Sequence, residues 1–478
     1  MLQRERMPVN STHPNYDDHL PVWLRIRDVL AGDDAIKRGG AKYVPRLQDH
    51  TDAQFNEYLQ RGFFYNATAR TVGGYVGLIF RRAPLFFGDE RGAGKRSQEI
   101  EVRSEETKSG TAPGVMGQVL SRFVNDVDLR GTTLDAYARH VVGEVISLGR
   151  SGTLIDWQED ESRAFVSHYP AESILNWREC RINGSLKLTL VVLAETVTAD
   201  NEADPYANEE VEQIRVLRLA RDNAERGVRN AESKTRPLTP ALSPDGGEGV
   251  HSKSSDANLT VSMEPKDPLH TFTVEIWQRR TRAGGRGRDW VLVRSVTPTR
   301  RGRPLQSIPF VFHGPTHSRA DVEKPPIADL VAANLDHYRL NTDYKHGMHF
   351  TALPTAFVSG FDRSAELKIG ATTAWVTETI GATAGFLEFK GQGLGTFEKA
   401  LDRTERLMTV LGSRLLETQK RVSESAEALA IRQAGESSII GSLAVAVTAS
   451  LNDVLRWVYW WHSIDEEAMG GRHQGPEL

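Results

Sequence analysis

Few residues in this 478-residue sequence have the types and spacing that catalysis needs. The segment GAGKR (92–96) is similar to a phosphate-binding loop, but the first glycine of that motif would fall at Asp89 and its magnesium-binding hydroxyl at Arg96. The segment GESSI (435–439) lacks the closing glycine of a nucleophile elbow. We therefore expect no enzyme, no catalytic residue and no bound cofactor.

Metal-binding patterns are also incomplete. Asp126 and Asp128 begin like a calcium loop, but the twelfth position, which needs a bidentate glutamate, is Tyr137. His346 and His349 lie three residues apart on an expected helix without an acidic or cysteine partner at ligand spacing. We interpret these two histidines, with His337 on the same helix, as polar residues on the helix surface, and we expect no metal site.

The composition argues against several further classes of protein. Lys and Arg total 59 against 63 Asp and Glu, so the net charge of −4 argues against a protein that binds nucleic acid over its whole surface. The single cysteine, Cys180, cannot form an intramolecular disulfide. The N-terminus lacks the apolar region of a secretory signal. No window reaches the ~18 uncharged apolar residues of a membrane span, the longest candidate being 439–451.

The first third of the chain is expected to be helical. Thr51 and Gln54 fit a capping box that begins one helix. Amphipathic stretches follow at 115–127 and 134–148, and Gly149 is placed to cap the second.

Short β-branched and aromatic runs then predict strands. They fall at 153–157, 164–169, 186–193, 214–219, 272–278, 290–296 and 308–313. We expect one largely antiparallel sheet, because no long helix separates the later strands, and hence an α+β fold. Residues 231–258 interrupt this region with proline, glycine and serine and no aromatic residue, which predicts a disordered or loosely held insertion without a functional site.

The C-terminal third has a different order. Pro325 and Pro326 precede a helix expected over 327–350, which Pro354 prevents from continuing. A small unit rich in glycine and threonine follows, with strand-like pieces at 356–359, 374–377 and 386–389. A second long helix is expected over 397–417, with Asp402 and Arg406 as an i,i+4 pair. After a polar break, the last helix is expected over 426–461.

This order of helix, small β unit, helix, polar loop and long helix resembles the portal (head–tail connector) proteins of tailed bacteriophages, in the branch related to siphophages. The resemblance covers nearly the whole chain and depends on the order and spacing of several segments, none of which is a catalytic signature. They are VWLRIRD (22–28), RGFFYN (61–66), NDVD (125–128) with Gly131, LGR (148–150) before LID (154–156), IPFVF (308–312), PPIADL (325–330) leading into 334–344, and SAEA (425–428) with Arg432.

The resemblance implies an α+β portal-like subunit with a helical and β-rich wing, two long stem helices flanking a small α/β clip, and a long C-terminal helix. The implied regions are an N-terminal helical wing (1–150), a β-rich wing (151–324) with the insertion 231–258, stem helix 1 (325–350), the clip (351–395), stem helix 2 (396–416), a tunnel loop (417–426), and a helix returning to the wing with a short crown (427–478). The insertion and the short crown depart from the family pattern.

The resemblance also implies a function. Portal proteins form homo-oligomeric rings of twelve subunits at one capsid vertex, through which double-stranded DNA passes during packaging and ejection. Implied partners are the terminase motor, head-completion or adaptor proteins, and capsid and scaffold proteins, with no membrane. The protein would reside in the virion, and in the host cytoplasm during assembly. Lys420, Arg421 and Ser423 in the tunnel loop would face the DNA, although an outer surface loop is the alternative for them.

Two other classes remain open. One is a different virion structural protein, such as a capsid or tail subunit, which would not be expected to place a β unit between two long helices. The other is a nucleic-acid-processing enzyme, which would need clustered carboxylates or a phosphate loop.

A channel for DNA should not bind the duplex tightly, because each neutralised phosphate adds affinity that translocation must undo. A mildly acidic chain suits this requirement.

Overall fold

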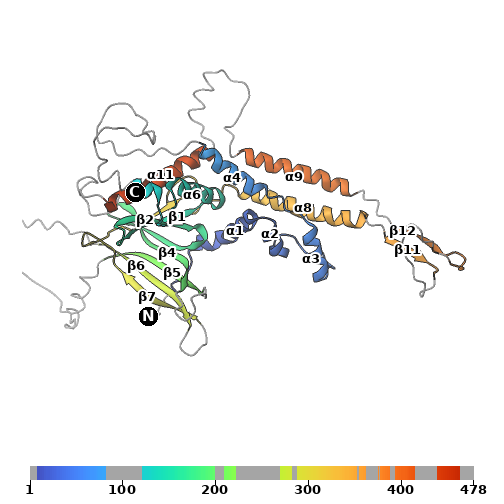
Figure 1. Ribbon diagram of the computed structural model, residues 1–478, viewed down its shortest axis with the longest axis horizontal. Helices are drawn as coiled ribbons and strands as arrows, with labels where there is room; N and C mark the ends of the chain where they lie inside the picture. The colour runs from blue at the N-terminus through green and yellow to red at the C-terminus, as the bar shows by residue number, and fades with distance from the viewer. Residues whose placement is uncertain are drawn as a thin grey trace, which may run out of the picture.

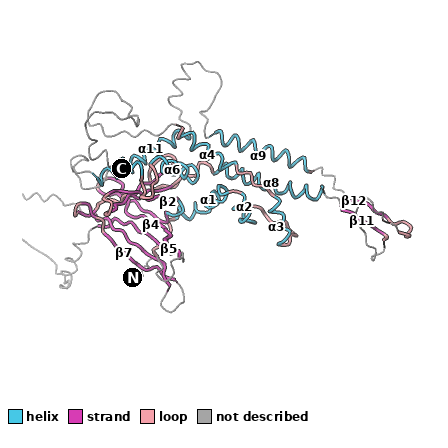
Figure 2. Tube along the Cα trace, in the orientation of Figure 1, coloured by secondary structure: helices cyan, strands magenta, loops and turns pink. Residues whose placement is uncertain are grey.

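The chain has the predicted α+β fold. The computed structural model describes residues 8–81, 121–199, 209–221, 270–281, 288–352, 355–361, 375, 377–387, 393–414 and 439–462. Two long helices, α8 (Ala328–Ala352) and α9 (Leu394–Arg414), project side by side from a body of helices and sheets toward a small β hairpin (Figure 1). Figure 2 shows the strands gathered at one end of the molecule and at the far tip, with helices between them.

The N-terminal helices follow the sequence signals. They are α1 (Pro14–Ala31), α2 (Asp33–Gly39), the short 3-10 helix η1 (Gly40–Lys42), α3 (Asp52–Arg61), α4 (Ala67–Ile79) and α6 (Leu134–Leu148). The capping box of α3 is confirmed, because the Thr51 hydroxyl accepts from the Gln54 amide while Gln54 Oε1 accepts from the Thr51 amide at 2.9 Å. Of the helix expected over 115–127, residues 121–125 are helical and 115–120 lie outside the described residues.

Gly149 ends α6 as predicted. Its φ is +72°, and a Cβ there would lie 2.9 Å from the carbonyl oxygen of Glu323. Both the left-handed backbone and this close approach require glycine, which brings the start of β1 against the segment before α8.

The expected single sheet is wrong in one respect, because the strands form two antiparallel sheets. The smaller sheet has the order β10 (Phe310–His313), β1 (Ser151–Gln158) and β2 (Arg163–Pro170). The larger sheet has the order β3 (Ile174–Ile182), β4 (Ser185–Ala199), β5 (Glu209–Arg221), β6 (His270–Thr281) and β7 (Arg288–Val296). All seven predicted strands are present, and the division arises because β10 returns to pair with β1, burying Phe310 completely.

Strand β3, which follows β2 after the 3-10 turn η2 (Ala171–Ser173), was not predicted from the sequence. This strand carries charged residues on its outer face and buries Ile174 and Trp177 on the other, so its apolar signal is weak. A further pair of two-residue strands, β8 (Thr299–Arg300) and β9 (Arg303–Pro304), forms a tight hairpin.

The last helix, α11 (Ile439–His462), lies in the core of the body. Leu443, Val447, Val454 and Trp457 are almost fully buried in the cluster that also holds α6 and both sheets. By length and composition α11 could cross a membrane, which differs from the expectation that no segment could. Because its buried face packs against β10, β2 and α6, its apolar character serves the core of the body.

The C-terminal third has the predicted order with shifted boundaries. Helix α8 starts one residue later and ends two residues later than expected, and α9 starts three residues earlier. At the tip, β11 (Thr355–Ser359) pairs with β12 (Thr383–Leu387) in antiparallel register. The strand predicted over 374–377 is wrong, because neither Trp375 nor Thr377 is in a strand. Asp402 and Arg406 lie exposed on α9 and form no ion pair with each other within the described chain.

Several predictions fall outside the described residues. They concern the insertion 231–258, the tunnel loop 417–426, the first part of the last helix and the glycine-rich segment 92–96.

A chain of polar side chains crosses the core of the body. The Tyr137 hydroxyl on α6 lies 2.6 Å from Thr153 Oγ1 on β1, and Thr153 Oγ1 lies 2.6 Å from His313 Nε2 on β10. His313 Nδ1 lies 2.7 Å from Ser450 Oγ on α11. Burial lowers the pKa of His313 to about 3 and, with a smaller contribution from His140, lowers the pKa of His168 to about 3.

These two histidines predict acid destabilisation. Between the folded pKa of about 3 and the unfolded value near 6.5, the unfolded state binds more protons, so stability falls as pH drops below about 6.5. Each histidine should contribute a slope of up to about 1.4 kcal/mol per pH unit. In urea titrations between pH 4 and 7, His313→Gln should lower the stability at pH 7 and reduce this slope. A slope in His313→Gln equal to that of the wild type would contradict the assignment.

Candidate functional site

The rod formed by α8, the β hairpin and α9 is the part of the molecule that reaches furthest from the body (Figure 1). Helix α9 presents a buried stripe of Leu401, Thr404 and Met408 to α8, at the i, i+3, i+7 spacing of one helix face. Met408 meets Leu330 and Ala333 of α8 in a small cluster of its own. Hydrophobic packing along one side of each helix therefore holds the two as a pair.

Asn334 joins the rod to α4 near the body. The side chain is fully buried, and its Oδ1 accepts from the Thr68 amide at 3.2 Å and from the Thr68 hydroxyl at 2.9 Å. Its Nδ2 donates to the Tyr65 carbonyl at 2.8 Å. Three hydrogen bonds from one amide hold the first turn of α4 against the second turn of α8. Loss of the two bonds to Thr68 would leave two buried polar groups unpaired.

Helix α3 braces the rod further toward the tip. The Tyr58 hydroxyl donates to Asp343, and Arg61 Nη2 lies 3.1 Å from His349 Nε2. Burial, with the positive charge of Arg61, lowers the pKa of His346, whose ring also packs against Tyr58 at 5.0 Å between centroids. The positive charge of Arg61 beside these two histidines disfavours the binding of a metal cation by them.

The prediction that the histidines of α8 are polar residues on the helix surface is wrong for His337. This residue is 3% exposed, and its Nε2 lies 3.3 Å from Glu405 Oε1 of α9. The amphipathic pattern of α8 is weak because several partners cover it, so the sequence did not distinguish a buried histidine from an exposed one. Among the described residues, no group of three histidine, cysteine or acidic side chains could hold a metal ion.

The tip of the rod exposes apolar side chains. The two-stranded hairpin leaves Phe357 47% and Phe386 55% exposed, and Ile380 in the same unit is fully exposed. A two-stranded sheet is at best marginally stable alone. The tip is therefore suited to contact with another surface.

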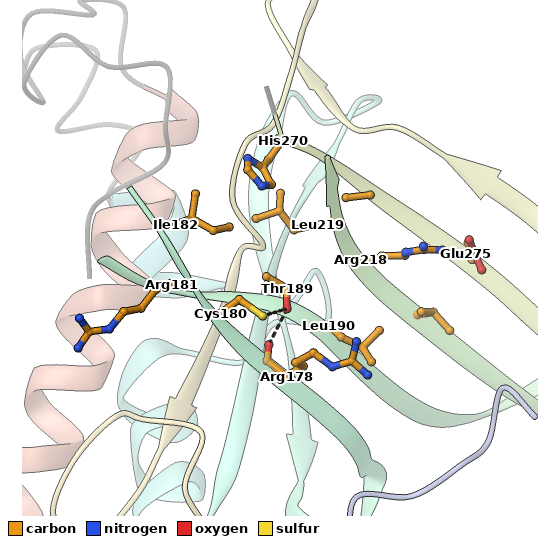
Figure 3. Close-up of a pocket in the computed structure, with 12 residues that line it drawn as sticks. Arg178, Cys180, Arg181, Ile182, Thr189, Leu190, Arg218, Leu219, His270 and Glu275 are labelled. Atoms are coloured by element: carbon orange, nitrogen blue, oxygen red, sulfur yellow. Dashed lines mark hydrogen bonds between the residues drawn. The ribbon is translucent and has the colours of Figure 1, made fainter. Parts of the chain in front are cut away.

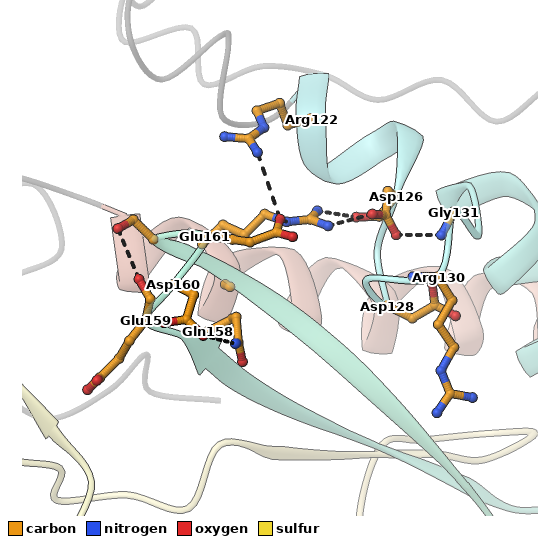
Figure 4. A network of polar contacts seen from close by, with 12 residues as sticks. Arg122, Asp126, Asp128, Arg130, Gly131, Gln158, Glu159, Asp160 and Glu161 are labelled. Carbon is orange, nitrogen blue, oxygen red and sulfur yellow. Dashed lines mark hydrogen bonds and ion pairs between the residues drawn. The ribbon is translucent and has the colours of Figure 1, made fainter. Parts of the chain in front are cut away.

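The segment with calcium-like spacing is a hydrogen-bonded turn. Asp126 Oδ1 accepts from the Gly131 amide at 2.9 Å, and Asp128 Oδ1 accepts from the Arg130 amide at 3.0 Å (Figure 4). Arg163 from β2 pairs with Asp126 at 2.5 Å and with Glu161 at 3.0 Å. These contacts engage the carboxylates that a cation would need, and the segment is a helix end followed by a turn.

The outer face of the larger sheet is open and cationic. Arg178, Arg218 and His270 line a shallow depression with Glu275 and Cys180 (Figure 3). The Thr189 hydroxyl lies 3.6 Å from the Cys180 sulfur and donates to the Arg178 carbonyl at 3.2 Å. Among the described residues, no basic side chain hydrogen-bonds to the Cys180 thiol, whose hydrogen-bond contact is the Thr189 hydroxyl.

The residues predicted to face DNA, Lys420, Arg421 and Ser423, lie outside the described residues. Their position therefore stays a prediction. The described chain leads into this region at the body end of α9 and leaves it at the start of α11.

A comparison with known protein families gives a match over the last third of the chain. The profile of a family described as "Domain of unknown function (DUF4055)" matches residues 326–462, which include α8, the tip, α9 and α11. The match indicates an uncharacterised phage-type domain over this part of the chain. No curated protein is similar enough in sequence to count as a match.

Replacing Asn334 should release α4 from the rod. Asn334→Leu leaves the amide and the hydroxyl of the buried Thr68 without their acceptor, so we expect the free energy of unfolding to fall by about 2–4 kcal/mol. Amide hydrogen exchange in 67–79 should become faster. Asn341→Leu on the same helix removes one partly exposed hydrogen bond, to the Phe63 amide, and should have a smaller effect. Equal effects of the two variants would contradict the role of Asn334.

Proposed function

We propose that this protein is a phage portal protein: a ring at one capsid vertex that conducts DNA during packaging and ejection and docks the terminase motor and head–tail connector proteins. The observation that carries the proposal is the order and placement of the last third of the chain. Two long antiparallel helices extend from the body to a β hairpin, and the chain then returns to a helix in the body core.

This order matches the stem, clip and stem sequence that the family resemblance implies. In that assignment α8 and α9 are the stem helices, the unit around β11 and β12 is the clip, and the two sheets with α1 to α6 are the wing. The phage-type domain match over 326–462 supports the assignment, because it spans these same elements.

The chemistry of the described residues is consistent with a structural role. The buried histidines pair with hydroxyls or carboxylates, and the carboxylates of the 126–131 turn accept from amides and arginine. A conduit needs stable walls and weak contacts with the duplex, which such an arrangement can supply.

The proposal predicts a ring. Negative-stain electron microscopy of the purified full-length protein should show closed rings with a central hole, whose rods run roughly along the ring axis. A closed shell would instead favour a capsid subunit. A protein that stays monomeric at micromolar concentration would contradict the proposal.

The tip should be needed for docking. Replacing Phe357 and Phe386 by serine removes exposed apolar surface without altering the buried core. We expect the body to fold with an unchanged thermal midpoint, because exposed substitutions typically change stability by no more than about 0.5 kcal/mol. Binding of the cognate terminase, measured by co-sedimentation with assembled rings, should be lost. Leu186→Ser, at an exposed apolar residue of the body, is the control, and terminase binding equal to wild type in the tip variant would contradict this role.

A further inference from the structure

Helix α9 carries two parallel stripes of opposite charge on its exposed side. The acidic stripe consists of Glu398, Asp402 and Glu405, and the basic stripe consists of Lys399, Arg403 and Arg406. Both follow the spacing i, i+4, i+7, which places each set along one line of the helix. All six residues are exposed.

Glu405, the last residue of the acidic stripe, borders a groove between α9 and α4. The groove has a volume of about 710 Å³, and Glu405 and Met408 line it from α9 while Gly74 and Leu78 line it from α4. A Cβ at Gly74 would meet no atom within 4 Å, so the backbone of α4 is accessible at this point. One cation, Arg70, lies in the groove, where its guanidinium stacks on the Tyr65 ring at 5.1 Å.

The basic stripe differs from the acidic one in its contacts. Glu398 accepts from the Tyr344 hydroxyl at 2.8 Å, and Glu405 faces His337. Within the described part of the chain, Lys399, Arg403 and Arg406 form no ion pair. Leu407 is 46% exposed and Val410 is 42% exposed beside them. Three unpaired cations next to two exposed apolar side chains form a surface that another acidic, partly apolar surface would complement.

We infer that the basic stripe of α9, with Leu407 and Val410, docks against the acidic stripe and the α4–α9 groove of a second copy of this chain. The inference deepens the proposed function, on which it rests, by naming the interface between neighbouring subunits. The contact is heterologous, since one face of a subunit meets a different face of the next, and such contacts close into rings when the rotation allows.

The register of the two stripes supports this arrangement. Each acidic residue is followed directly by a basic one, so the paired positions differ in height along the helix by only about 1.5 Å. Rotation about an axis along the rod keeps every subunit at the same height. The neighbours of Glu398, Asp402 and Glu405 across the contact are then Lys399, Arg403 and Arg406, and each charge of one stripe meets an opposite charge of the other.

Charge exchange between adjacent positions tests the contact. Asp402→Arg and Arg403→Glu each bring like charges together at every interface, so we expect the concentration for half-maximal assembly to rise by at least about tenfold. The double variant Asp402→Arg/Arg403→Glu restores opposite charges with the wild-type net charge, and assembly should return to near the wild-type concentration. Mass photometry or sedimentation velocity of the full-length protein measures assembly, and Asp49→Arg is the control at an exposed charge outside both stripes.

A steric test uses two neighbouring glycines of α4. Gly74→Leu fills the groove, whereas Gly73→Leu adds the same side chain on the same exposed helix outside the residues that line the groove. Both changes favour the helix in the isolated subunit. We expect Gly74→Leu to prevent assembly and Gly73→Leu to permit it.

The outcomes separate this interface from the proposed function. Rings in the wild type that persist in both single charge variants and in Gly74→Leu would overturn the interface and leave the ring proposal standing. Absence of rings in the wild type would overturn both.

A lower thermal midpoint for Gly74→Leu at unchanged assembly would mean that another part of the same chain fills the groove. Unchanged assembly of Arg403→Glu with lost binding to a short random DNA duplex would mean that the basic stripe faces nucleic acid.

Discussion

The rod depends on the packing of α8 against several partners at once. Near the body, Ile327, Val331 and Leu335 enter the main core, while Leu330 and Ala333 meet α9. Tyr338 is fully buried beside Phe64, at 5.7 Å between ring centroids, and Asn334 holds α4. Helix propensity alone does not keep a single long helix stable in water, so the packing of α8 against these partners is what allows the rod to project from the body.

The body supplies the anchor for the rod through contacts between distant parts of the chain. Arg150, 1% exposed, lies between the Trp177 ring of the larger sheet and the Phe312 ring of the smaller one, at 3.8 and 4.5 Å from their centroids. Its Nη1 donates to the Ala320 carbonyl at 2.9 Å, and burial lowers the pKa of Arg150 to about 9. A buried cation stacked on two aromatic rings thus joins both sheets to the segment that leads into α8.

Polar side chains of the body and of the rod differ in how many partners they have. In the body, Arg27 pairs with Glu144 at 2.5 Å and with Glu172 at 2.6 Å, and the polar chain from Tyr137 to Ser450 links four elements. On the rod, Lys399, Arg403 and Arg406 of α9 are exposed and form no ion pair within the described residues. The polar groups of the body therefore help to define the fold, whereas these charges of the rod lie at its surface.

Local signals in the sequence determined the class of fold, most helices and seven strands, because capping residues and apolar periodicity act over a few residues. Thr51 with Gln54 and Gly149 are such cases. Only the tertiary structure decided that β10 pairs with β1, that β3 joins the larger sheet and that His337 is buried, because these depend on residues far apart in the chain. The same reason applies to the candidate surfaces: the charges of α9 can be counted in the sequence, but only its packing on α8 and α4 shows which stripes face outward.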